Sequence, residues 1–114
     1  MLYPYMTLDD MTEIVHSEVL PDGRVKVIME TPDELDFFHN AVCYLPEMRW
    51  EKIFGYTEEE LCFFHRLIKS NRDSIMRYAA QGGRNSTAQE QEKIWSISEL
   101  AAKLARKEAV SYEI

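Results

Sequence analysis

Two cysteines and two of the three histidines carry the side chains of a possible zinc site. His39 and Cys43 lie four residues apart, and Cys62 and His65 lie three residues apart. Residues three apart share one face of a helix, whereas four residues of strand span about 13 Å at about 3.3 Å each. Zinc ligands must converge within about 2.3 Å of one ion. A strand at residues 37–45 would therefore exclude the first pair, and a helix there would restore it. We expect no metal and no cofactor.

Cys62 is a candidate nucleophile, because the N-terminus of a helix lowers the pKa of a thiol. The three consecutive glutamates at residues 58–60 precede it and would raise the same pKa. Neither thiol is accompanied by a glycine-rich elbow or a phosphate loop. Acidic pairs such as Asp9-Asp10 fall at turns and helix starts, where carboxylates are common. We therefore expect no catalytic residue and no enzyme activity.

Four basic side chains recur along one predicted helix: Arg66, Lys69, Arg72 and Arg77. Within residues 61–83 they are opposed only by Asp73. Such a face suits contact with an acidic protein surface or with a phosphate backbone. The net charge of −7 and the pI of about 4.9 disfavour nucleic acid. These four residues are the candidate interaction site, for a protein partner first and for nucleic acid second.

The acidic excess lies entirely in the first half of the sequence. Residues 1–57 contain 11 acidic and 4 basic residues, and residues 58–114 contain 9 of each. This asymmetry favours electrostatic pairing with a partner or with a second copy. A small sheet covered by one helix also leaves an edge and part of a face that dimerisation would protect. We predict a non-enzymatic protein-interaction or regulatory module that forms a homo-oligomer.

Length and composition fit one small domain over residues 1–114. The chain is 46% hydrophobic and 29% charged, as in ordinary globular proteins. Its apolar runs are far shorter than the roughly 20 residues that span a bilayer. The start of the chain lacks a basic segment followed by an apolar one, and two cysteines make no disulfide framework. We expect a cytoplasmic protein with reduced thiols and no membrane contact.

Residues 1–56 show the alternation of a sheet. Asp9-Asp10-Met11 predicts a hairpin turn, and Pro21-Asp22-Gly23 is a strong turn signal. Residues 37–45 fit either a strand or a helix, and residues 46–56 resemble an irregular connector. A strand at residues 37–45 gives an antiparallel meander of three or four strands. The core is predicted to include Val25, Val27, Val42, Trp50 and Phe54.

Residues 57–83 predict one long helix. Thr57 and Glu60 form a capping box, and Gly82-Gly83 ends the helix. The helix is followed by two further capping boxes, Thr87 with Glu90 and Ser96 with Glu99, so residues 84–114 contain one helix or two. The alternating tail at residues 109–114 predicts an edge strand. One helical face is apolar and is interrupted by Asn71: Leu61, Phe64, Ile68, Ile75, Tyr78 and Ala79.

The predicted fold class is therefore α+β: an antiparallel meander packed by one long helix, with a C-terminal helix.

Several stretches resemble a group of short uncharacterised proteins of integrative and conjugative elements in gut Firmicutes. The resemblance covers about residues 2–83. In that group the first turn reads Asp-Gly, where this sequence has Asp10-Met11. The resemblance implies a cytoplasmic accessory protein of a mobile element and transfers no catalytic residue. The matching stretches are Tyr3-Pro4-Tyr5-Met6-Thr7-Leu8, Thr12-Glu13-Ile14-Val15-His16-Ser17, Cys43-Tyr44-Leu45-Pro46 and Tyr78-Ala79-Ala80-Gln81-Gly82-Gly83.

Overall fold

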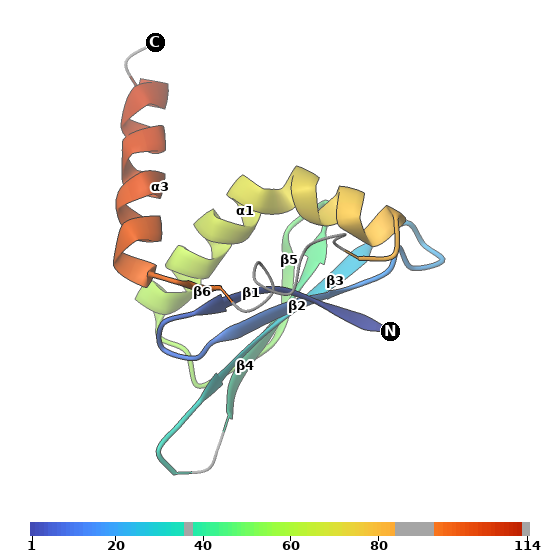
Figure 1. Ribbon diagram of the computed structural model, residues 1–114, viewed down its shortest axis with the longest axis horizontal. Helices are drawn as coiled ribbons and strands as arrows, with labels where there is room; N and C mark the ends of the chain where they lie inside the picture. Colours follow the sequence, from blue (N-terminus) through green and yellow to red (C-terminus); the bar gives the residue numbers. More distant parts are fainter. Residues whose placement is uncertain (36–37, 84–92, 113–114) are drawn as a thin grey trace.

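The protein is described by a computed structural model covering residues 1–35, 38–83 and 93–112 (Figure 1). These residues form an α+β fold, as predicted. Its elements are β1 (Leu2–Leu8), β2 (Glu13–Ser17), β3 (Val25–Pro32), β4 (Phe38–Leu45), β5 (Arg49–Phe54), α1 (Glu58–Ala80), β6 (Ile94–Trp95) and α3 (Ile97–Tyr112). None of the helices in these ranges is long and apolar enough to cross a lipid bilayer.

The six strands form one mixed sheet in the order β5-β4-β3-β2-β1-β6. The first five are antiparallel neighbours, and β6 pairs in parallel with β1. The predicted meander of three or four strands was therefore too small. Residues 37–45, which fitted a strand or a helix, are strand from residue 38 onward and pair with β3 along its whole length, from Val25 opposite Leu45 to Pro32 opposite Phe38.

The prediction of an irregular connector at residues 46–56 was wrong, because β5 pairs with β4 there. Met48 and Lys52 have φ angles of 63° and 53°, and the register shifts between Asn40 and Val42. These interruptions break the regular alternation that marks a strand in a sequence. A two-residue strand such as β6 has no periodicity, and its pairing with β1 depends on how the chain returns to the sheet.

Both predicted turns are present. Met11 ends the first hairpin turn with φ 71°, and its N–H donates to the Leu8 carbonyl at 2.9 Å. Gly23 has φ 86°, a conformation that favours glycine, and donates to the Leu20 carbonyl at 2.8 Å. These turns bring β1, β2 and β3 together as neighbours.

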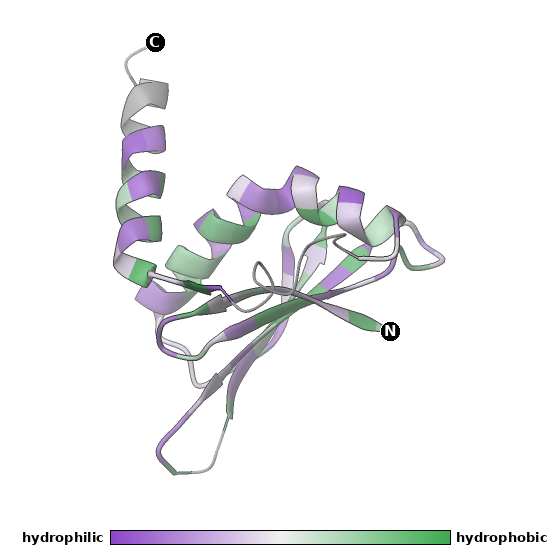
Figure 2. Cartoon of the chain, in the orientation of Figure 1, coloured by the Kyte–Doolittle hydropathy of each residue, from purple (hydrophilic) through white to green (hydrophobic). Residues whose placement is uncertain are grey.

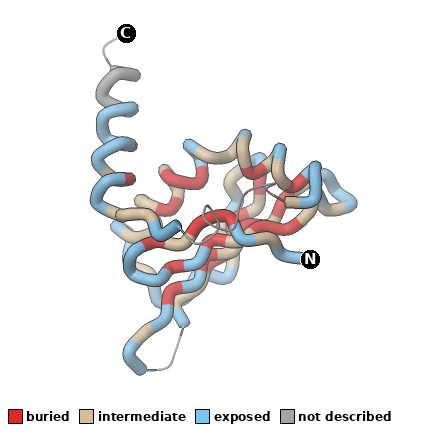
Figure 3. The backbone as a smooth tube through the Cα atoms, viewed as in Figure 1, coloured by how far each residue is buried: buried red, intermediate tan, exposed pale blue. Residues whose placement is uncertain are grey.

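The helix α1 covers one face of the sheet, and the core lies between them (Figures 2 and 3). It begins at the predicted capping box: the Glu60 N–H donates to Thr57 Oγ1 at 3.2 Å, and the Thr57 N–H donates to Glu60 Oε1 at 2.8 Å. Phe54, predicted to lie in the core, is 58% exposed, and Trp50 is only partly buried. The buried residues of α1 are Phe64, Leu67, Ile68, Ile75 and Ala79.

The C-terminal segment is helical rather than extended. The predicted edge strand at residues 109–114 is wrong through Tyr112, where α3 ends, and residues 113–114 lie outside the described residues. An alternation over six residues is too short to predict a strand on its own, and the helix that begins at Ile97 continues through it. At the start of α3 the Glu99 N–H donates to Ser96 Oγ at 3.2 Å. The predicted capping box at Thr87 and Glu90 lies outside the described residues. Within the described residues, α3 is the helix that follows α1.

Candidate functional site

Three of the four predicted interaction residues line a cavity between α1 and α3. Its volume is about 350 Å³. Spacings of three residues place Arg66, Lys69 and Arg72 along one side of α1. The residues that line it are His65, Arg66, Lys69, Ser70, Arg72, Leu104 and Lys107. The basic side of α1 therefore forms one wall of a groove whose other wall is α3.

A second cavity, of about 410 Å³, continues this groove toward the sheet. Both cavities share Ser70, Leu104 and Lys107. The deeper cavity is lined by Tyr5, Met6, Leu67, Ser70, Asn71, Trp95, Leu100, Lys103, Leu104 and Lys107. Its apolar members lie toward the core, whereas Lys103 and Lys107 are exposed. The groove thus has an apolar floor and a basic rim, and we refer to the space formed by these two cavities as the α1–α3 groove.

The first hairpin turn and β6 place α3 beside α1. The Asp9 N–H donates to the Trp95 carbonyl at 2.9 Å, and the Ile97 N–H donates to Asp9 Oδ1 at 3.3 Å. Asp9 therefore accepts from the first turn of α3, where a carboxylate also meets the positive end of the helix dipole. From this anchor α3 rises away from the sheet at an angle to α1 (Figure 1). The two walls of the groove consequently diverge.

Asn71 interrupts the apolar face of α1 and is fixed at the floor of the groove. Its Oδ1 accepts from the Tyr5 hydroxyl at 2.6 Å, and its Nδ2 donates to the Leu67 carbonyl at 2.8 Å. Asn71, which interrupts the apolar face of α1 in the sequence, therefore joins α1 to β1. This bond holds the floor of the groove against the sheet.

The C-terminal helix adds basic residues that sequence reasoning did not assign to the site. Lys103 and Lys107 line the groove, and Arg106 lies with Lys103 in a neighbouring cavity of about 280 Å³. The Lys107 Nζ donates to Ser70 Oγ of α1 at 3.2 Å, so the two walls are in contact. The spacing of four residues between Lys103 and Lys107 predicts that both lie on one face of a helix. It does not predict against which other helix that face packs.

Two of the predicted basic residues make contacts away from the groove. Arg72 lines it but donates from Nη1 to the Pro46 carbonyl at 3.3 Å. Arg77 lies in the last turn of α1, with its guanidinium 5.2 Å from the centre of the Tyr78 ring. Arg77 lines neither cavity of the groove. The basic site is therefore narrower on α1 than predicted and extends onto α3.

The four cysteines and histidines considered as metal ligands are engaged separately. Cys43 is buried on the face of β4 that α1 covers, and Cys62 is exposed on α1. His65 Nδ1 accepts from Trp50 Nε1 at 2.9 Å. Across the parts of the chain that the structure describes, no three His, Cys, Asp or Glu side chains are grouped to hold a metal ion.

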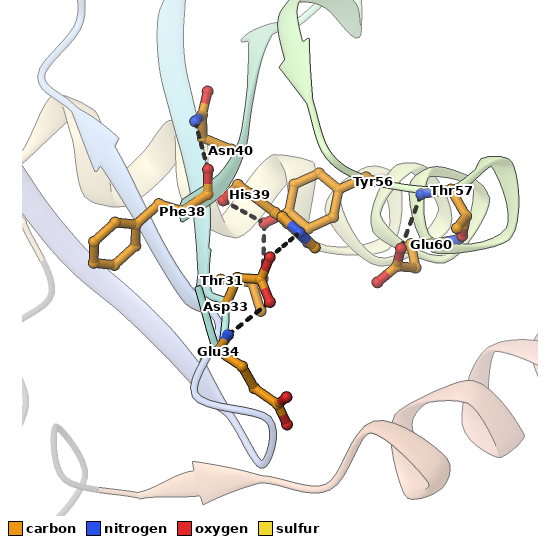
Figure 4. A network of polar contacts seen from close by, with 9 residues as sticks. All are labelled: Thr31, Asp33, Glu34, Phe38, His39, Asn40, Tyr56, Thr57 and Glu60. Atoms are coloured by element: carbon orange, nitrogen blue, oxygen red, sulfur yellow. Dashed lines mark hydrogen bonds and ion pairs between the residues drawn. The ribbon is translucent and has the colours of Figure 1, made fainter. Parts of the chain in front are cut away.

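A second polar cluster connects the ends of β3 and β4 to the start of α1 (Figure 4). His39 Nε2 lies 3.4 Å from Asp33 Oδ2, and its ring meets the Tyr56 ring edge-on, with the ring centres 5.6 Å apart. The Tyr56 hydroxyl donates to the His39 carbonyl at 3.2 Å and shares a hydrogen bond of 2.8 Å with Thr31 Oγ1. A Cβ at Gly55 would lie 2.4 Å from the His39 ring, so only glycine leaves room for this contact.

Burial governs the chemistry of Tyr56 and of the core thiol. Burial raises the pKa of Tyr56 to about 12, although its bond to Thr31 acts in the opposite direction. Burial likewise raises the pKa of the Cys43 thiol to about 12. Both groups therefore keep their protons near neutral pH, and neither is an activated nucleophile. The hydrogen bonds of Tyr56 to Thr31 and to the His39 carbonyl fix the chain before α1 onto the sheet.

No family profile, curated protein or solved structure matches this chain.

Proposed function

We propose that this protein is a non-enzymatic protein-interaction module that binds an acidic, amphipathic helical segment of a partner in the α1–α3 groove. The observation that carries the proposal is the groove itself, with an apolar floor beneath exposed lysines on both walls. Amphipathic helices bind in grooves between helices through apolar side chains spaced three or four residues apart. Lysines on the rim select a segment whose solvent-facing side is acidic.

Leu67, Leu100 and Leu104 supply the apolar part of the site. All three are buried, but they border open space between the helices. Trp95 borders the same space and is only partly buried. A partner side chain that enters there exchanges water for apolar contact, which favours binding by roughly 25 cal/mol per Å² of buried apolar surface.

Nucleic acid is the second candidate, because Arg66, Lys69, Arg72 and Lys107 could also meet phosphates. It ranks lower for two reasons. The largely apolar floor of the groove suits apolar side chains rather than phosphates, and the net charge of −7 repels a polyanion at long range. The two candidates differ in what remains after nuclease treatment.

Photo-crosslinking from inside the groove tests the proposal. A photoreactive amino acid at Ser70 should crosslink a protein in nuclease-treated lysate of cells that naturally contain this protein. Mass spectrometry of the adduct should map the crosslink to a segment with acidic and apolar residues. The matched control has the photoreactive group at Asp73, which is three residues away on α1 and lines neither cavity.

The double charge reversal K69E/K107E should remove the Ser70 adduct, because it replaces one cation on each wall of the groove by an anion. Equal adducts from positions 70 and 73, or an adduct that survives K69E/K107E, would contradict the proposal. An adduct to nucleic acid that nuclease removes would favour the second candidate instead.

The resemblance to proteins of integrative and conjugative elements stays a prediction. Under it, we propose that the partner is a protein of the same mobile element, and the sequence of the crosslinked segment tests this directly.

A further inference from the structure

The face of the sheet opposite α1 carries its own pattern of side chains. In β3 the buried residues Val25, Val27 and Met29 alternate with Lys26, Ile28 and Glu30, which point to the other face. Within the described residues, the two helices α1 and α3 lie on the same side of the sheet (Figure 1). We call the opposite side the open sheet face, formed by five antiparallel strands.

Most charges on the open sheet face lie in two rows across the strands. At one end Lys26 lies opposite Tyr44, which lies opposite Arg49. At the other end Glu13 lies directly opposite Glu30. Like charges in direct cross-strand pairs destabilise a sheet, so the chain carries an unfavourable pair at this end.

An apolar row separates these two charged rows. Val15 lies opposite Ile28, and Ile28 lies opposite Val42. Val15 and Ile28 are partly exposed, whereas Val42 is 8% exposed. Glu51 follows in the same row on β5, where its Oε1 lies 3.4 Å from Arg49 Nε. The open sheet face therefore has a basic end, a middle row that is apolar except for Glu51 at the edge, and an acidic end, with residue 28 at its centre.

Two copies of this face can pack with either of two kinds of two-fold axis in the plane between them. An axis parallel to the strands places Lys26 over Lys26 and Glu30 over Glu30. An axis perpendicular to the strands, through the row of Ile28, places Lys26 over Glu30 of the partner subunit and Ile28 over Ile28. The second arrangement pairs Lys26 with Glu30, and two-fold symmetry makes this contact occur twice. It also places Glu51, which lies beside Arg49 of its own chain, over Glu51 of the partner subunit.

The size of the face also suits a second copy. Five strands about 4.8 Å apart, with about seven residues at about 3.3 Å each, give a face of roughly 550 Å² in projection. This projection is about two thirds of the roughly 800 Å² per subunit that stable protein interfaces bury.

Pairing through the edge strand β5 is the alternative route to a dimer, and the structure disfavours it. Lys52 has φ 53°, and the ladder of β5 is irregular beside it. Arg49, Glu51 and Lys52 place three charges along this short strand. Bulges and charges of this kind protect the edge of a sheet from pairing with another chain.

We infer that the open sheet face binds a second copy of this chain, face to face, with Lys26 against Glu30 of the partner subunit around a two-fold axis through the row of Ile28. This interface lies on the other side of the sheet from the α1–α3 groove, so it stands independently of the proposed function. It also gives the paired Glu13 and Glu30 carboxylates a neighbouring cation.

Charge-swap variants measured by sedimentation equilibrium test the inference. The wild-type chain should form dimers, and K26E or E30K alone should raise the dimer Kd about tenfold or more, because each places like charges in contact twice. The double variant K26E/E30K should restore the wild-type Kd, because residues 26 and 30, which contact each other across the interface, exchange charge. K69E changes the net charge as K26E does but lies on α1, so its dimer Kd should stay at the wild-type value.

A crosslink on the unaltered chain gives a second readout that does not depend on the folding of variants. Lys26 and Glu30 of one subunit lie four residues apart on a strand, about 13 Å, beyond the reach of a carbodiimide. In mixed ¹⁴N and ¹⁵N protein, a Lys26–Glu30 crosslink joining light and heavy peptides is expected. A wild-type chain that stays monomeric at its highest soluble concentration overturns the inference. Single variants that dimerise as the wild type does, or a double variant that is not restored, also overturn it.

Discussion

The two faces of the sheet carry alternate residues of the same strands and differ in what they demand of a side chain. On the face under α1, Val25, Val27 and Met29 are completely buried. On the open sheet face, the intervening Lys26, Ile28 and Glu30 mix charge with apolar surface. The covered face is filled mainly by apolar side chains, with His16 buried opposite Val27, and this packing determines the fold. Side chains on the open sheet face do not pack against α1, so their charges are available to contact another molecule.

The groove between α1 and α3 extends this contrast to the helices. Leu67 and Leu104 are buried at the floor, while Lys69 and Lys107 stand at the rim one or two turns away. Apolar positions hold the two helices together, and neighbouring positions on the same helices carry the charges that we propose meet a partner.

The largest effect is expected from truncation of one aromatic ring in two environments. Phe64→Ala should lower the free energy of unfolding by about 3–5 kcal/mol, because Phe64 is 3% exposed in the core. Phe54→Ala, the same change at a 58% exposed position on β5, should cost less than about 1 kcal/mol. Urea denaturation measures both values. Equal losses would break the distinction between the covered and the exposed positions.

The next prediction compares the loss of stability on replacing two glycines that have similar backbone angles. Gly55 and Gly23 have φ angles of 88° and 86°, but only Gly55 faces the His39 ring. Gly55→Ala should cost about 2 kcal/mol or more, because backbone strain and a steric clash add. Gly23→Ala should cost about 1 kcal/mol, from strain alone. If the two variants unfold at the same urea concentration, the contact between His39 and Gly55 does not hold β4 to the start of α1.

A smaller, stabilising effect is expected at the tip of the first hairpin. Met11 has φ 71° and is half exposed. Met11→Gly should stabilise the fold by about 0.5 kcal/mol, because relief of left-handed strain outweighs the added entropy of the unfolded chain. The melting temperature should rise by about 2 °C. Met11→Ala keeps the strain and should give no increase.

The last prediction concerns the pH dependence of the free energy of unfolding, which is smallest near neutral pH and increases at alkaline pH. Burial raises the pKa of Cys43 from 9.0 to about 12 and that of Tyr56 from 10.0 to about 12. Between these values the unfolded chain releases protons that the folded chain retains, so a rise in pH favours unfolding. The free energy of unfolding should therefore fall from about pH 9 and more steeply above pH 10. Tyr56→Phe should lose the steeper part, and a flat profile between pH 8 and 11 would contradict this explanation.

Much of the fold follows from local patterns in the sequence. The capping box at Thr57, the turn at Gly23 and the alternation of β3 each act within a few residues, and all three predictions are confirmed. The strands β5 and β6 escaped prediction for opposite reasons. Positive φ angles interrupt the first, and the second is too short to show a period.

The candidate site was predictable only in part. The spacing of Arg66, Lys69 and Arg72 identified one wall, because residues three apart share a helix face. The second wall depends on Asp9, which accepts a hydrogen bond from α3 across 88 residues of sequence. A contact of that range leaves no local pattern, so Lys103 and Lys107 could not be placed beside α1 from the sequence alone.

Binding of the crosslinked partner segment tests the central claim most directly. That segment, synthesised as a peptide, is titrated by calorimetry into the wild-type chain, into K69E/K107E and into K26E/E30K, at two salt concentrations. We predict that K69E/K107E weakens binding about tenfold or more and that higher salt weakens wild-type binding. K26E/E30K should bind the peptide with the wild-type Kd, because its substitutions lie on the open sheet face. Binding to K69E/K107E as tight as to the wild-type chain would contradict the assignment of the α1–α3 groove.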